Sequence, residues 1–217
     1  MDTKCLELIY MLVKSGAEEI LRIMKESARK DYILKKAKNW RFTFVEILMF
    51  LFFEVDFSLH IFKQKKEVRE ILIPWLIDRM LNDLTLNNIK DKIQNISYKR
   101  MSEYGEVSDE EFGKNPSNVF IPFLKNVMFS IYKNDLFEPG MVYPIEALDA
   151  FSQFRINSSF HSSGVIYYFG VKIYLKYLFQ DNSNFFALER KEINKRLNEA
   201  KVEIEKVSHK FFKKNKR

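Results

Sequence analysis

Residues 42–62 read F-T-F-V-E-I-L-M-F-L-F-F-E-V-D-F-S-L-H-I-F, and this stretch decides the fold. As a helix, it carries apolar side chains on every face, which is typical of a helix buried in a large core or in lipid. Four ionisable residues interrupt it, and such groups are costly to bury unless they are paired or used for chemistry: Glu46, Glu54, Asp56 and His60. We therefore expect this helix at the centre of the protein.

The composition favours an all-α fold. The chain of 217 residues is 47% hydrophobic, with 21 Phe and 10 Tyr, so it can bury a substantial core. Only six Gly and five Pro leave little material for the turns of a β-sandwich. We predict a multi-helix bundle of about seven to nine helices around the buried central helix 42–62, with a long amphipathic C-terminal helix.

Two regions are predicted along the chain. Residues 1–186 form a compact helical domain, and residues 187–217 form a long basic helix. Within the first region, the polar stretch G-E-V-S-D-E-E-F-G-K-N-P-S-N at 105–118 predicts a loop and a candidate internal boundary, with the preceding helix ending before Gly105.

Local signals place two further boundaries. Ser15-Gly16 predicts the end of a first helix, and Ser15-Gly16-Ala17-Glu18 matches a capping box that opens a second. Residues 165–179 mix β-branched and aromatic residues with lysines one helical turn apart. A helix is favoured there, although a strand also fits the pattern.

The N-terminus and the cysteine content indicate the compartment. M-D-T-K-C-L-E lacks the basic start and apolar core of a signal peptide, and no apolar run approaches the roughly 20 residues of a membrane span. The single Cys5 excludes an intramolecular disulfide and a cysteine-based zinc cluster. We expect a soluble, cytoplasmic protein without a transmembrane segment.

The polar groups of the central helix define a first candidate site. Thr43-Phe44-Val45-Glu46 matches a capping box, which accounts for Glu46, and Glu54 is expected at a solvent-facing edge. Asp56 and His60 lie one turn apart, so they can pair with each other, hold a buried polar contact or share a metal. Metal ligands at recognised spacing are absent, and a metal-binding bundle is therefore the weaker hypothesis.

A second candidate site lies between residues 155 and 161. The segment Arg155-Ile156-Asn157-Ser158-Ser159-Phe160-His161 resembles the R-x4-6-H signature of HEPN domains, a helical family that includes metal-independent ribonucleases acting as dimers. The resemblance implies that Arg155 binds the scissile phosphate and that His161 assists proton transfer, roles that suit guanidinium and imidazole. A structural alternative pairs Arg155 with a buried acid such as Asp56.

The C-terminal helix carries a third candidate site. Apolar residues recur at spacings of 4-3-4-3-4, the heptad rhythm of a coiled-coil seam, at Ile193, Leu197, Ala200, Ile204, Val207 and Phe211. This seam can pack on the body, pair with a second copy or receive a partner helix. Residues 187–217 also hold eleven Lys/Arg and five Asp/Glu, a balance of +6 out of +7 for the whole chain. Its basic tail can contact phosphates or an anionic surface through Lys210, Lys213, Lys214, Lys216 and Arg217.

These observations favour a helical protein-interaction module, self-associating or bound to a protein partner, with a basic C-terminal end. RNA or another polyanion is a further candidate partner for the C-terminal helix. The alternative is a HEPN-like ribonuclease of the toxin or phage-defence type, acting through Arg155 and His161. No cofactor is expected, because the sequence contains no Walker A, G-x-G-x-x-G, G-x-S-x-G or H-E-x-x-H motif.

Overall fold

The protein is helical throughout the part that the structure describes. In a computed structural model, the described residues are 3–28, 40–111, 120–138, 141–142, 170–180 and 187–214. They contain seven helices with defined bounds and no strand, and residues 170–179 are also helical. The bounded helices are α1 (Thr3–Ala28), α2 (Arg41–Ile61), α3 (Lys66–Asp83), the short 3-10 helix η2 (Asn87–Ile89), α4 (Lys90–Glu111), α5 (Phe120–Lys133) and α8 (Arg190–Lys214). The predicted all-α fold is confirmed, with a helix number at the low end of the predicted range.

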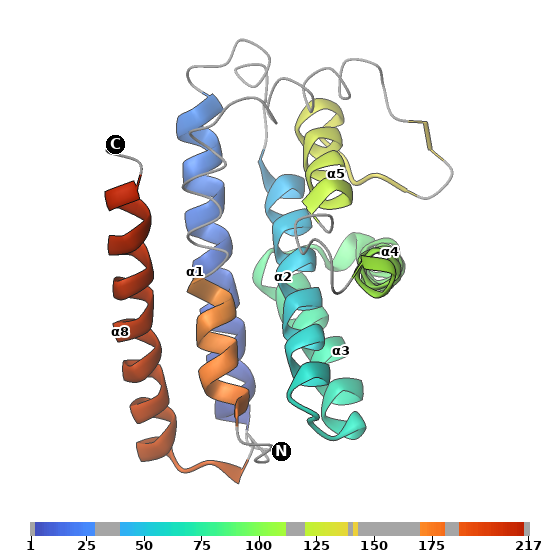
Figure 1. Ribbon diagram of the computed structural model, residues 1–217. Helices are drawn as coiled ribbons and strands as arrows, with labels where there is room; N and C mark the ends of the chain where they lie inside the picture. The colour runs from blue at the N-terminus through green and yellow to red at the C-terminus, as the bar shows by residue number, and fades with distance from the viewer. Residues whose placement is uncertain are drawn as a thin grey trace.

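Helix α2 forms the centre of the bundle, as its sequence predicts. Helices α1, α3, α4 and α5 all pack against it, and Figure 1 shows α2 between α1 and α5. Because neighbours surround it, consecutive residues are buried whichever way they point, including Ile47, Leu48, Met49, Phe50, Leu51 and Phe52. The all-round apolar pattern therefore reflects a helix packed on every side.

Helix α1 is continuous through Ser15-Gly16, so the predicted break at this position is wrong. The glycine has a packing role instead. A Cβ atom added at Gly16 would lie 2.5 Å from Cγ2 of Val171, in the helical segment 170–179. Gly16 thus lets two helices approach closely. The residues Ser15-Gly16-Ala17-Glu18, which match a capping box in sequence, lie in the interior of α1.

Helix α4 continues through Gly105 and ends at Glu111, so the predicted helix end before Gly105 is also wrong. No atom lies within 4 Å of the position that a Cβ of Gly105 would take. A single glycine lowers helix stability by only about 1 kcal/mol relative to alanine, which a packed helix can absorb. Residues 112–119 lie outside the described part, and the internal boundary at 105–118 stays a prediction.

The C-terminal third contributes two adjacent helical stretches. Residues 170–179 are helical, which confirms the favoured interpretation for that range, whereas 165–169 lie outside the described residues. In Figure 1 this segment, in orange, is drawn in front of the lower part of α1. The Cδ1 atom of Ile204 lies 4.0 Å from where a Cβ of Gly170 would be, so α8 comes close to the first residue of this segment.

Across the described helices, none combines the length and the apolar character needed to span a bilayer.

Candidate functional site

A buried polar cluster centres on Arg100 of α4. Its guanidinium binds both carboxylate oxygens of Glu46, with Nε–Oε2 at 3.0 Å and Nη2–Oε1 at 2.8 Å. Arg100 is 2% exposed and Glu46 is fully buried, so this is a desolvated, two-pronged ion pair. Burial raises the pKa of the Glu46 carboxyl above its ordinary value, and the charge of Arg100 opposes that shift.

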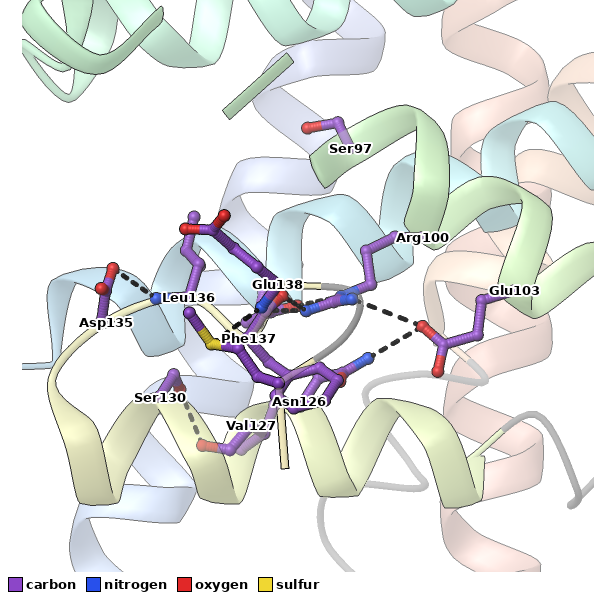
Figure 2. A network of polar contacts seen from close by, with 12 residues as sticks. Ser97, Arg100, Glu103, Asn126, Val127, Ser130, Asp135, Leu136, Phe137 and Glu138 are labelled. Carbon is purple, nitrogen blue, oxygen red and sulfur yellow. Dashed lines mark hydrogen bonds and ion pairs between the residues drawn. The ribbon is translucent and has the colours of Figure 1, made fainter. Parts of the chain in front are cut away.

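Arg100 has two further acceptors, one in its own helix and one in the stretch after α5. Nη2 donates to the carbonyl of Phe137 at 2.7 Å, and Nη1 lies 3.4 Å from Glu103. Asn126 of α5 donates to the same Glu103 oxygen at 3.3 Å. Figure 2 shows Arg100 and Asn126 converging on Glu103 from different helices. Because Arg100 is bound by groups of the protein itself, we interpret this cluster as a structural tie between α2, α4 and α5.

Glu46 therefore does not cap α2. The helix begins at Arg41, its N-cap residue Trp40 makes no side-chain capping bond, and Thr43 lies inside the helix. The hydroxyl of Thr43 instead forms a hydrogen bond with Ser130 of α5, with the two oxygens 3.0 Å apart. The local capping pattern was misleading because both polar side chains serve tertiary contacts.

Asp56 and His60 are joined through Arg69 of α3, a partner that the sequence pattern did not reveal. Arg69 binds both oxygens of Asp56 at 2.7 Å, and its Nη1 lies 3.4 Å from Nδ1 of His60. The positively charged guanidinium of Arg69 thus contacts both candidate metal ligands. Asp56 thus forms a polar contact with Arg69, but this contact is only part-buried and His60 is exposed, in contrast to the expected buried contact.

Glu54 does not reach a solvent-facing edge, in contrast to the expectation. It is 2% exposed, and its Oε2 lies 3.2 Å from the ammonium of Lys172 in segment 170–179. Among the described residues, no group of three or more His, Cys, Asp or Glu side chains is placed to hold a metal ion. The metal hypothesis for Asp56, His60 and Glu54 gains no support there.

Arg155 and His161 lie outside the described residues, so the HEPN-like motif stays a sequence-based prediction. In the basic tail, Lys210, Lys213 and Lys214 belong to α8, and Lys216 and Arg217 follow it outside the described part.

The predicted seam of α8 faces the body over its first half. Ile193 and Ala200 are 8% and 0% exposed, and Leu197 packs against the core. Further along, Ile204 and Val207 are only half-buried, and Phe211 lies in α8 with no described side chain. Leu197 is also half-buried, but the fully buried seam residues, Ile193 and Ala200, both lie in the first half of the helix.

Arg196 holds the first half of α8 in place, and sequence reasoning missed it. Its buried Nη1 donates to the carbonyls of Leu178 at 3.2 Å and Gln180 at 3.0 Å, and its Nε donates to Glu192 at 3.0 Å. The last carbonyls of a helix have no partner within that helix, so a basic side chain can satisfy them. The seam was identified from the spacing of apolar residues alone, so Arg196, a charged residue beside it, did not stand out.

Comparisons with protein-family models, with curated proteins and with solved structures gave no match.

Proposed function

We propose that the protein is a helical interaction module that associates with copies of itself through the second half of α8. One observation carries this proposal: Ile193 and Ala200 are buried and Leu197 between them is half-buried, whereas beyond Ala200 both described seam side chains, Ile204 and Val207, are only half-buried. Apolar residues in a heptad rhythm are most stable when a second helix covers them. The rest of the chain covers Ile204 and Val207 only in part, so these residues are available to a second copy.

The first half of α8 is committed to the body by Arg196 and by the buried Ile193 and Ala200. Self-association is therefore confined to a short contact around residues 204–211. Such a contact buries little apolar surface, and we expect association that depends on protein concentration.

The test is the oligomeric state of the double variant Ile204→Glu/Val207→Glu, measured by sedimentation over a range of concentrations. Two carboxylates in the seam should turn a self-associating wild type into a monomer without unfolding the body. The matched control is Val202→Glu, because Val202 is 50% exposed and two residues, or about 200°, away from Ile204 around the helix. A wild type that stays monomeric at every concentration, or an equal effect of the control, would refute the proposal.

One sequence observation favours a second candidate function, a metal-independent ribonuclease. Arg155 and His161 have the spacing of the HEPN signature, and the chain is helical in its described part. The purified protein should then cleave RNA in the presence of a chelator, and His161→Ala should abolish cleavage while leaving the circular dichroism spectrum unchanged. Absence of cleavage by the wild type, or cleavage that persists in the variant, rules this function out.

A further inference from the structure

Charged residues of both signs border the seam over the second half of α8. At 100° per residue, Glu203 and Lys210 fall about 80–100° from the middle of the seam on one side, and Lys201 falls about 80° from it on the other. Glu203 is half-buried and Lys201 is exposed, and neither forms an ion pair with another residue in the described part of the chain. Residues that border a seam face the bordering residues of a partner helix, so their charges influence how that helix lies.

An antiparallel second copy would bring opposite charges together. A two-fold axis midway between Ile204 and Val207 places Ile204 of each copy against Val207 of the other. Along the bordering side, Glu203 then lies opposite Lys210 of the second copy, within about 3 Å along the helix axis at 1.5 Å per residue. The symmetry repeats this pair, so the contact contains it twice.

A parallel second copy would gain no such pair. In parallel helices, a residue on this side of the seam faces the residue five positions later on the other side of the partner's seam. Glu203 would then face Ser208, which is uncharged. Lys201 does not oppose the antiparallel direction, because there it lies opposite the same uncharged residue. The charges beside the seam therefore favour antiparallel helices.

The attachment of α8 to the body favours the same direction. Ile193 and Ala200 are buried in the first half of the helix, and Arg196 is bound there to backbone carbonyls between residues 178 and 180. In a parallel pair, these covered halves would lie side by side, and the chain that covers each of them would keep the helices apart. In an antiparallel pair, each covered half lies instead beside the C-terminal end of the other helix.

We propose that the second copy binds α8 in the antiparallel direction, with Glu203 and Lys210 forming two reciprocal ion pairs between the copies. This arrangement rests on the proposed self-association and adds the direction of the partner helix to it. Exposed ion pairs contribute little affinity, whereas they discriminate between alternative arrangements. The apolar Ile204 and Val207 thus supply most of the attraction, and the two charges select the direction.

The direct test is the distance between spin labels in concentrated protein, measured by pulsed electron paramagnetic resonance. One label per chain is attached to Lys195→Cys or to Lys206→Cys, in a Cys5→Ala background. Both lysines are exposed and lie within about 20° of each other on the side of α8 away from the seam. In the antiparallel pair, the two labels are about 30 Å apart along the axis at position 195 and almost level at position 206.

The possible outcomes separate the direction from self-association itself. A much longer distance at position 195 than at position 206 supports the antiparallel pair. Equal distances at the two positions would mean parallel helices, which overturns the direction while self-association stands. No distance between chains, together with a monomer in sedimentation, would refute both.

Reversing the two charges gives an independent test by sedimentation. Glu203→Lys and Lys210→Glu should each raise the Kd of self-association about threefold to tenfold, because each variant places like charges opposite one another twice. The combined variant Glu203→Lys/Lys210→Glu restores both pairs in reverse and should associate as the wild type does. Net charge alone cannot produce this result, since the two single variants change it in opposite directions.

The matched controls are Glu199→Lys and Lys206→Glu, which have the same spacing of seven residues and lie farther from the seam, where both residues are exposed. Neither should change the Kd appreciably. Single variants at 203 and 210 that shift the Kd in opposite directions, or a combined variant that stays as weak as the single ones, would overturn the reciprocal pairing.

Discussion

Arg100 is the centre of the polar cluster that ties α2, α4 and α5 together. It places a charge in a site that is almost wholly closed to water, and it is stable there because Glu46, Glu103 and the carbonyl of Phe137 surround it. A buried ion pair of this kind adds little net stability, since desolvation offsets most of the attraction. Removing one partner, however, leaves an uncompensated charge in the core.

We expect Glu46→Gln to lower the free energy of unfolding by about 3–5 kcal/mol, because Arg100 would lose its countercharge while staying buried. The double variant Glu46→Leu/Arg100→Met removes both charges and should be much less destabilised. Urea unfolding of the two variants gives the comparison. A single variant as stable as the wild type would show that the pair is dispensable.

The contacts of Asp83 allow a prediction of how the free energy of unfolding changes in acid. The Lys14 ammonium, 2.7 Å from Asp83, holds the pKa of that carboxyl below its ordinary value, and the hydroxyl of Tyr10 also donates to it at 3.0 Å. The unfolded chain then binds the proton more readily, with a pKa of about 3.9. The stabilisation by Asp83 is therefore present above about pH 5 and is lost as the pH falls through the lowered pKa.

Asp83→Asn should accordingly be less stable than the wild type at pH 6, and the difference should shrink toward pH 3. Urea midpoints measured across this range show the trend. A difference that stays constant with pH would mean that the charge of Asp83 is not responsible.

At the scale of single elements, the sequence predicted features that depend on residues close together in the chain. The apolar residues on all faces of 42–62 predicted a central helix, and α2 extends from Arg41 to Ile61. Contacts between distant parts of the chain could not be predicted in this way. The partner of Glu46 lies 54 residues away and that of Asp56 lies 13 residues away, and neither spacing is a helical one.

Gly16 and Gly105 show the same limit for glycine. Both were expected to end helices, and both lie within one. Their roles differ only through tertiary structure, since a methyl group at Gly16 would meet Val171 at 2.5 Å, whereas at Gly105 it would meet nothing within 4 Å.

The two glycines therefore form a matched pair of variants. Gly105→Ala should raise the free energy of unfolding by up to about 1 kcal/mol through helix propensity. Gly16→Ala should lower it by about 1–3 kcal/mol, because the branched Val171 side chain has little freedom to move away. Adding Val171→Ala to Gly16→Ala should recover part of the loss. Thermal unfolding tests this account, which fails if the two single variants change stability in the same direction.

At the scale of the whole molecule, the two halves of α8 differ. The first half packs on the body through Ile193, Ala200 and Arg196, and the second half is the part that we propose binds a second copy. The sequence predicted the seam and its rhythm. It could not predict that the seam is buried at Ile193 and Ala200 and less buried at Ile204 and Val207, because that depends on how the rest of the chain packs beside α8.

Amide hydrogen exchange along α8, measured at a low and a high protein concentration, tests this division most directly. We predict slow exchange in residues 190–200 at both concentrations, since the body covers them. Residues 204–211 should exchange faster in dilute protein and slow down when the protein is concentrated, as a second copy covers them. Fast exchange throughout 190–200, or exchange in 204–211 that does not change with concentration, would contradict the account.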